Sequence, residues 1–248
     1  MMKLLKHLAL GIGAAVLLLP AGAALPSPYH TSAEILAAFQ EMADGGAACP
    51  GAALTLTLAG QETGVPLTVA TFTQAGAVQG GSGSSSGEAN KDGGGRPDAA
   101  FVLFGEHARE LISPETALRM ARDLCGINKR TAKLAAKVLA RTVVTIVPNA
   151  NPRGRASVEG GAFCQRVNEN GVDLNRNWDA HWQSSSESGG ADTNPGAAPF
   201  SEPETQATQS FMAEVAARQV RGSGCCRSRR PGGWTSHVVT HTLLTIIE

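Results

Sequence analysis

The sequence predicts an α/β fold in which a mixed, mainly parallel sheet carries helices on both of its faces. Runs with the composition of β-strands alternate with runs whose apolar residues recur near every 3.6 positions. The run AAFVLF (99–104) is apolar throughout, which is typical of a strand that a parallel sheet buries on both faces. The 248 residues suffice for one sizeable domain or two small ones.

The first 23 residues have the order of a secretory signal peptide. Lys3 and Lys6 precede an apolar run from Leu8 to Leu19, and Pro20 and three small residues follow it. The run is too short for a membrane-spanning helix, which needs about 20 apolar residues. We therefore expect cleavage after Ala23 and a secreted protein; an uncleaved anchor or a transit peptide is the alternative.

The next segments predict one helix and two strands. Residues 32–43 (SAEILAAFQEMA) have helical apolar spacing and begin at an expected N-cap, Ser32. The alternating runs at 53–60 and 65–76 predict strands that a turn at QETG joins. The Gly- and Ser-rich segment at 79–96 lacks apolar periodicity, so we expect a disordered insertion there, with a domain linker as the alternative.

Helix and strand signals follow the AAFVLF strand. Ser113 and Pro114 predict the N-cap and first residue of a helix that ends at Gly126. Residues 131–140 predict a short helix, and the β-branched run at 141–147 predicts another strand.

Farther along the chain, the sequence predicts one turn and one more helix start. The Asn-Pro and Gly of NPRGR (151–155) predict a turn, to which we assign no chemistry. Ser201 and Glu204 have the spacing of a capping box before a helical run that reaches Val220.

Charge and cysteine content limit the classes of partner and site. Basic and acidic residues number 21 each, which gives no indication of a nucleic acid or a membrane surface as a partner. Five cysteines in a secreted chain predict one or two disulfides and a leftover thiol, with the pairing open. A cysteine zinc site is not expected, because the sequence has no CxxC pair.

The turn GEHARELIS (105–113) directly follows the buried strand. It places His107 and Glu110 three residues apart, and an imidazole and a carboxylate are natural zinc ligands. The alternative is an ordinary helix entry, in which Glu110 lies near the positive end of the helix. A His-x-x-Glu pair is weak evidence on its own, so its sequence context has to decide.

That context is an ordered series of motifs. The series consists of GEHARELIS, NANPRGR, CQRVNENGVDLNRNW and PFSEPET. In this order the motifs resemble those of the zinc carboxypeptidases of the carboxypeptidase A type, and their sequences are most similar to a plant and algal branch of that family. The resemblance runs from about residue 29, where YHTSAEI is also similar, to about residue 220. It implies a metallocarboxypeptidase hydrolase whose catalytic domain lies in residues 24–220, with one zinc ion and with peptide or protein C-termini as substrate.

The resemblance also implies roles for single residues. His107 and Glu110 match the first two zinc ligands, and Arg109 matches an arginine that contacts the substrate chain. Asn175 and Arg176 match the pair that grips the terminal carboxylate, which a guanidinium meets with two parallel hydrogen bonds. Arg166 matches the arginine that polarises the scissile carbonyl and stabilises the oxyanion.

Two acids next to these motifs have open roles. Asp173 and Asp179 either orient His107 through a hydrogen bond to the ring nitrogen that does not bind the metal, or form ordinary ion pairs.

The sequence departs from the family pattern after residue 220. The family's third zinc ligand is a histidine some twenty residues beyond SEPET, and the corresponding window, QVRGSGCCRSRR, contains none. His237 and His241 come later, as zinc ligands or as ordinary polar positions on a strand. The atypical composition of residues 221–248 suggests a change of reading frame or an unspliced boundary near Val220.

The chain as written is therefore expected to bind zinc weakly and to be inactive. The matches to the third ligand, the general-base glutamate and the tyrosine of the substrate lid are all missing from it. A non-catalytic protein that binds peptide C-termini and an incomplete fragment are the alternatives.

Overall fold

The computed structural model describes residues 25–26, 28–76, 97–184, 190–220, 235–239 and 242–247. The expected signal peptide and the Gly/Ser-rich segment at 79–96 lie outside the described residues, as does most of the tail at 221–248. None of the helices in the described ranges is both long and apolar enough to cross a membrane.

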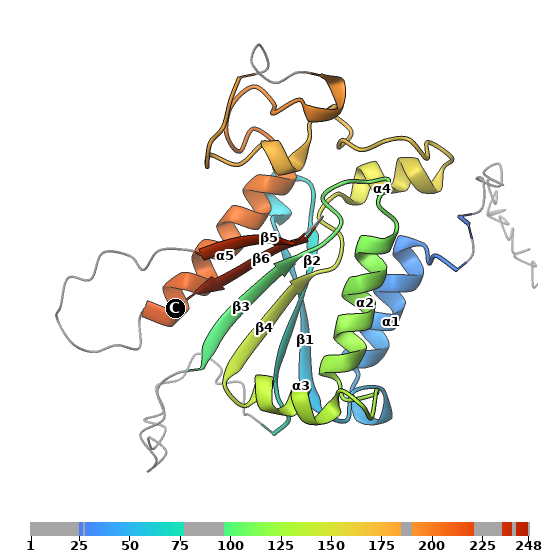
Figure 1. The fold of residues 1–248 in the computed structure, drawn as a ribbon, viewed down its shortest axis with the longest axis vertical. Helices are drawn as coiled ribbons and strands as arrows, with labels where there is room; N and C mark the ends of the chain where they lie inside the picture. The colour runs from blue at the N-terminus through green and yellow to red at the C-terminus, as the bar shows by residue number, and fades with distance from the viewer. Residues whose placement is uncertain are drawn as a thin grey trace, which may run out of the picture.

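A six-stranded sheet forms the centre of the described fold (Figure 1). Its strands lie in the order β1-β2-β4-β3-β6-β5. Their bounds are β1 Ala52–Ala59, β2 Leu67–Gln74, β3 Asp98–Leu103, β4 Thr142–Val147, β5 Thr235–Val239 and β6 Thr242–Ile247. The helices are α1 Ser32–Ala43, α2 Ile112–Leu124, α3 Ala132–Leu139, α4 Pro152–Glu159 and α5 Pro203–Val220.

The mixed sheet is confirmed, but the expectation that it is mainly parallel is wrong for the described strands. Only β3 and β4 pair in parallel, while the other four pairings are antiparallel. A parallel pair needs a long crossover, which α2 and α3 supply between β3 and β4. The short connections between β1 and β2 and between β5 and β6 instead make hairpins.

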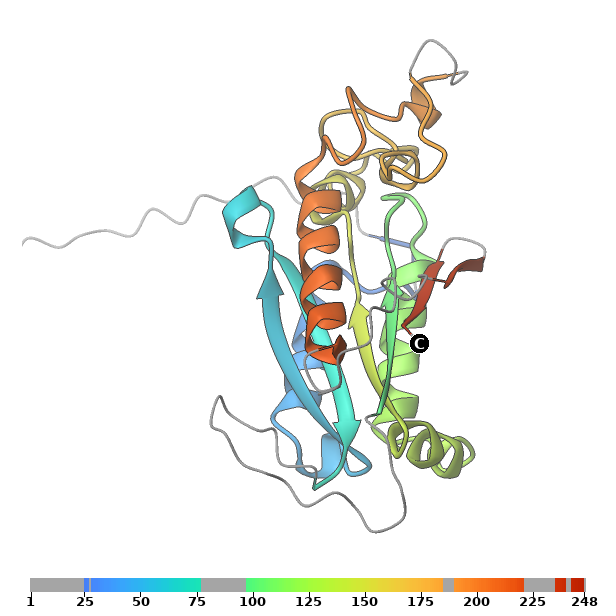
Figure 2. The same ribbon diagram turned by 90° about the vertical axis from the view of Figure 1, so that its left-hand side faces the viewer.

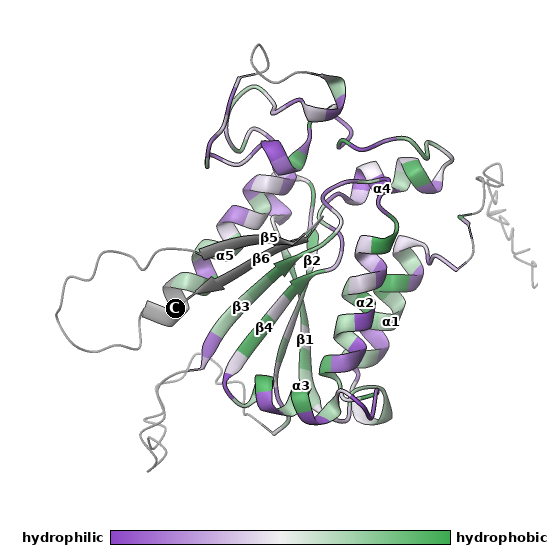
Figure 3. Cartoon of the chain, in the orientation of Figure 1, coloured by the Kyte–Doolittle hydropathy of each residue, from purple (hydrophilic) through white to green (hydrophobic). Residues whose placement is uncertain are grey.

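Helices cover both faces of the sheet, as predicted. Helices α1, α2 and α3 lie over one face, and Figure 2 shows α5 crossing the other. Alternate residues of β3 serve the two layers: Val102 belongs to the core under α1 and α2, and Phe101 to the core under α5. Figure 3 shows β3 and β4 as mostly apolar ribbons between helices with mixed surfaces. Each fully buried large apolar side chain stabilises the fold by roughly 1.5–3 kcal/mol.

The helix starts differ from the predicted ones because tertiary partners take the predicted caps. Thr31, not Ser32, caps α1 in a reciprocal box: its Oγ1 accepts from the N–H of Glu34, 3.2 Å away, and Glu34 accepts from the N–H of Thr31 at 2.7 Å. Ser32 donates its hydroxyl to Glu159 of α4 instead. Ser113 lies inside the first turn of α2, where its Oγ accepts from the N–H of Gly105 at 2.9 Å.

The NPRGR segment begins helix α4, so the predicted turn is wrong. Asn-Pro is also a helix-start signal, with Asn151 as the N-cap and Pro152 at the first position. The Asn151 side chain accepts from the N–H of Gly154 at 3.0 Å, and a Cβ on Gly154 would lie 2.4 Å from that oxygen. Arg155, 1% exposed, binds Glu159 and the carbonyl of His30, which ties the N-terminal segment to α4.

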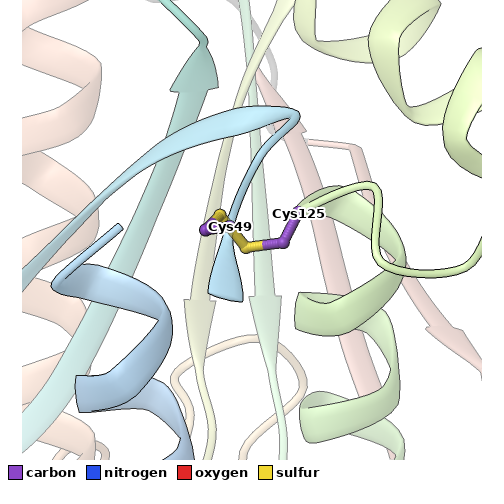
Figure 4. Close-up of a disulfide and its surroundings, with 2 residues drawn as sticks. All are labelled: Cys49 and Cys125. Carbon is purple, nitrogen blue, oxygen red and sulfur yellow. A yellow bond between two sulfur atoms is a disulfide. The ribbon is translucent and has the colours of Figure 1, made fainter. Parts of the chain in front are cut away.

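One disulfide, Cys49–Cys125, joins the start of β1 to the end of α2 (Figure 4). The expectation of at least one disulfide is confirmed. Closing a loop of 76 residues stabilises a fold by roughly 4 kcal/mol in the chain-entropy model. Cys164 is exposed and free, and Cys225 and Cys226 lie outside the described residues.

Candidate metal and substrate site

The candidate site lies where the parallel strands β3 and β4 end, at the top of the view in Figure 1. Hydrogen bonds join the two loops that leave these strands. The N–H of Ala150 donates to the carbonyl of Phe104 at 2.8 Å, and Asn151 Nδ2 donates to the carbonyl of Glu106 at 3.1 Å. Gly105 has a φ of 72°, which allows the sharp turn out of β3. The loop that carries His107 is therefore fixed on the strand ends.

His107 lies between two carboxylates and is 3% exposed. Its Nδ1 is 2.9 Å from Glu110 Oε1, and its Nε2 is 3.2 Å from Asp173 Oδ1. Burial acts to lower the pKa of His107, but the hydrogen bond to Asp173 and the charges of both acids outweigh it and raise this pKa. Burial acts in the opposite sense on Asp173, whose pKa is nevertheless lowered by His107 and by Arg166.

The donor atoms fit part of a zinc shell. Two zinc bonds of 2.0–2.2 Å at a tetrahedral angle hold their donor atoms about 3.4 Å apart, and Nδ1 of His107 and Oε1 of Glu110 lie 2.9 Å apart. The other ring nitrogen of His107 faces a carboxylate, as in most zinc-binding histidines. Among the described residues no group of three or more His, Cys, Asp or Glu side chains is arranged so that it could hold a metal ion.

Arg166 converges on the same group of residues. Its Nε and one terminal nitrogen donate to Asp173 Oδ2 at 3.1 and 3.0 Å, and its other terminal nitrogen is 3.4 Å from Glu110 Oε1. The carbonyl of Arg166 accepts from the N–H of Ala108 at 2.9 Å. The structure thus brings Arg166 beside both predicted ligands, with Asp173 as the shared anchor.

The remaining predicted residues lie around this centre. Asn175 and Arg176 belong to the short 3-10 helix Leu174–Arg176, and Asp173 Oδ1 accepts from the N–H of Asn175 at 3.0 Å. Arg176 is exposed. Arg109 donates to the carbonyl of Cys164 at 3.2 Å and to Asp192 at 3.0 Å.

Asp173 fills both of the alternative roles, because it contacts His107 and also forms an ion pair with Arg166. It is fully buried and holds His107, whereas Asp179 is exposed at the surface.

Glu106, which the sequence motifs do not single out, is buried beside the candidate ligands, with 4% of its surface exposed. Burial raises the pKa of its carboxyl to about 7, against the opposing hydrogen bond from Trp178 Nε1 at 3.2 Å. A glutamate in a polar turn is usually exposed, so only the contact with Trp178, 72 residues away, identifies it.

A polar framework supports the loop that carries Asp173. Asn177, fully buried, donates to the carbonyl of Pro195 and accepts from Thr205 Oγ1 at 2.6 Å. Asn168 Nδ2 donates to Glu202 at 2.8 Å and to Glu204 at 3.2 Å. The predicted Ser201–Glu204 capping box does not form, because the N–H of Ser201 donates to Ala198 and Glu204 faces Asn168.

We expect the Glu204→Gln variant to be more stable than the wild type at pH 8. Burial raises the pKa of Glu204, and the charge of Glu202 adds to the shift. Its Oε1 has no hydrogen-bond partner among the described residues. A raised carboxyl pKa means that the wild type loses stability as pH rises above 4.5, the ordinary value, through the folded-state pKa. Gln cannot ionise, so its advantage should grow from pH 5 to pH 8.

Melting temperatures of the two proteins at pH 5 and pH 8 measure this difference. Glu41→Gln, on the exposed face of α1, is the matched control and should show no such pH dependence. A difference between wild type and Glu204→Gln that is the same at both pH values would contradict a raised pKa.

The sequence of the chain matches the model of a known protein family. The model of the family described as zinc carboxypeptidase matches residues 43–224. The chain belongs to the zinc carboxypeptidase family. The predicted resemblance is therefore confirmed at the level of the family, and its closer likeness to a plant and algal branch stays a prediction.

Individual relatives agree with this assignment. The zinc carboxypeptidase chain is 35% identical over 135 residues to zinc carboxypeptidase A 1 of Anopheles gambiae, covering 49% of this chain and 29% of that protein. It superposes on the crystal structure of thrombin activatable fibrinolysis inhibitor with a TM-score of 0.55 and 25% identity, covering 75% of this chain and 44% of the other. The carboxypeptidase A of Helicoverpa armigera, 23% identical, shares the fold with a TM-score of 0.55, over 77% of this chain and 44% of its own. The chain thus spans less than half the length of each of these relatives.

Proposed function

We propose that this zinc carboxypeptidase family member serves the hydrolysis of C-terminal residues from peptides or proteins, with His107 and Glu110 as zinc ligands. The observation that carries the proposal is the convergence of one imidazole, two carboxylates and one guanidinium at the ends of β3 and β4. Arg166 lies 3.4 Å from Glu110, and both Arg166 and His107 are anchored on Asp173.

In this proposal, some side chains of the site bind the metal, and others orient the ligands or stabilise charge on the substrate. A zinc ion, when bound, polarises the scissile carbonyl and makes a water molecule more acidic. Asp173 fixes the ring of His107 and holds Nδ1 toward Glu110. Arg166 supplies positive charge beside the ligands, where negative charge develops on a carbonyl oxygen under attack.

The substrate would be held at two further points. Asn175 and Arg176 bind the terminal carboxylate, and the exposed guanidinium of Arg176 is accessible for this purpose. Arg109 contacts the chain that precedes the terminal residue.

Secretion is part of the same proposal. The order of the first 23 residues is that of a signal peptide. The Cys49–Cys125 disulfide supports an oxidising compartment, since disulfides persist mainly in secreted and extracellular proteins.

One observation favours a second candidate function, the binding of peptide C-termini without hydrolysis. No group of three or more His, Cys, Asp or Glu side chains that could hold a metal occurs among the described residues, whereas catalytic zinc sites ordinarily have three protein ligands. Both functions require Asn175 and Arg176 to bind the C-terminal carboxylate of a peptide, so a peptide-binding assay tests this common step. Removal of C-terminal residues from a peptide distinguishes the hydrolase from the binding protein.

We expect the Arg176→Lys variant to bind peptides with a free C-terminal carboxylate roughly tenfold more weakly than the wild type, because Lys cannot form two parallel hydrogen bonds to the carboxylate. The same peptides with an amidated C-terminus should bind poorly to both proteins and with equal affinity. Dissociation constants from fluorescence anisotropy give the comparison, and Arg130→Lys at an exposed position is the matched control. An equal loss of affinity for free and amidated peptides would remove the assigned role of Arg176.

A further inference from the structure

Asp192 contacts both Arg109 and Arg166, and it does so with two different groups. Its carboxylate oxygen Oδ2 lies 3.0 Å from a terminal nitrogen of Arg109. Its main-chain carbonyl accepts from Arg166 Nε at 3.0 Å. Asp192 lies 83 residues from Arg109 along the chain, so the fold alone creates this bridge.

The segment that carries Asp192 is fixed to the centre of the site. The N–H of Asp173 donates to the carbonyl of Asn194 at 2.8 Å, and Asn194 Nδ2 donates to the carbonyl of Gly171 at 2.9 Å. The 3-10 turn Ala191–Thr193 therefore has a set position relative to the acid that anchors His107. An anchor held this way can fix the direction of a flexible side chain.

Arg109 is the side chain that needs such an anchor. It is 37% exposed, and its other described partner is the carbonyl of Cys164 at 3.2 Å. The carboxylate of Asp192 is 61% exposed, and ion pairs this open add little to fold stability. The contact therefore matters mainly for where the guanidinium points. Asp192 also borders an open hollow of about 680 Å³, together with Asn170 and Asn194.

We propose that Asp192 is a positioning residue for the substrate chain. Its carboxylate orients Arg109, and its carbonyl helps to orient Arg166, so that one short turn sets the spacing between the two guanidinium groups. The proposal rests on the proposed function, because it assumes that Arg109 meets the part of a peptide that precedes its terminal residue.

The two kinds of contact lead to a specific expectation. A side-chain substitution at Asp192 removes the carboxylate but keeps the carbonyl, so it should act through Arg109 alone. Substrates too short to reach Arg109 should not register the change. A longer peptide should bind less well, because an unanchored guanidinium loses rotamer freedom on binding.

The test measures dissociation constants of the full chain for two ligands with free carboxylates, N-acetyl-phenylalanine and an N-acetylated tetrapeptide that ends in phenylalanine. We expect Asp192→Ala to weaken binding of the tetrapeptide roughly three- to tenfold and to leave binding of N-acetyl-phenylalanine unchanged. Asp192→Asn, which keeps an acceptor oxygen, should recover part of the loss. Asp179→Ala, an exposed acid on the same loop segment, is the matched control.

A double-mutant cycle completes the test. The Arg109→Ala and Asp192→Ala losses should not add, since both remove one interaction, whereas Asp192→Ala and Arg166→Ala should add. Additive losses with Arg109→Ala, or an equal loss for both ligands, would overturn the positioning role while leaving the proposed function intact. Failure of the wild type to bind either ligand would overturn the proposed function and this proposal with it.

Discussion

The Asp173→Ala variant should unfold with a free energy roughly 3–5 kcal/mol below that of the wild type, because it removes the buried carboxylate that pairs with both His107 and Arg166. Asp173 is 0% exposed and binds Arg166 through its Oδ2 and His107 and the N–H of Asn175 through its Oδ1. Urea unfolding of the metal-free proteins measures the difference.

The loss should depend on pH in a defined way. The pKa of Asp173 is lowered below 3.8, so its contribution is present above that value and is lost as pH falls through the folded-state pKa. The pKa of His107 is raised above 6.5, so its contribution is complete below that value and is lost as pH rises through the folded-state pKa. The difference between wild type and variant should therefore be largest between about pH 4 and pH 6.5.

Asp179→Ala is the matched control, since it removes an exposed carboxylate from the same loop segment. It should change the free energy of unfolding by no more than about 0.5 kcal/mol. A loss for Asp173→Ala that is equally small would show that the contacts of this acid do not hold the site together.

The strands could be predicted well because their burial pattern is written in the local sequence. The alternating run at 53–60 became β1, and the apolar run at 99–104 became β3, within one or two residues at each end. The pairing direction could not be predicted in the same way. It depends on which strands the chain brings together, and β6 pairs with β3 although more than 130 residues separate them.

The N-cap residues of α1 and α2 could not be predicted from the local sequence. Thr31, Ser32 and Ser113 all have side chains that can cap a helix, and the sequence does not show which of them has a partner elsewhere in the fold. Ser32 is used by Glu159 and Ser113 by Gly105, so neither caps its own helix.

Some residues of the candidate site could also be predicted from local sequence, and others could not. His107, Glu110 and Arg166 lie together as the ordered motifs indicated. Asp192 had no signal in the sequence, because its role depends on a contact that spans 83 residues. The ordered motifs predicted the residues proposed to meet the metal or the substrate, whereas only the fold identifies the residues that contact them.

The full chain, purified and dialysed against buffer without metal, should retain little zinc. His107 and Glu110 are the two proposed ligands, and no group of three or more His, Cys, Asp or Glu side chains that could hold a metal occurs among the described residues. Structural sites with four ligands bind zinc with about 10–16 kcal/mol, so two ligands correspond to roughly half of that. The expected dissociation constant then lies between about a micromolar and a few hundred micromolar.

Zinc titration with a colorimetric chelator as competitor measures this constant, and metal analysis after dialysis gives the retained amount. His107→Ala should abolish the remaining affinity, because Nδ1 of His107 faces Glu110 and no other described imidazole does. His181→Ala, at an exposed histidine, is the matched control and should leave zinc binding unchanged.

The opposite outcome has a specific cause that the same experiment can identify. Stoichiometric zinc after dialysis would mean that a third ligand comes from outside the described side chains, and His237 and His241 are the candidates. His237 belongs to β5, which pairs with β6, and β6 in turn pairs with β3, the strand that leads to His107. If His237→Ala or His241→Ala then released the metal, the zinc shell would be completed from that hairpin. Trimming of a model peptide by the loaded wild type would in that case decide between a hydrolase and a protein that only binds peptide C-termini.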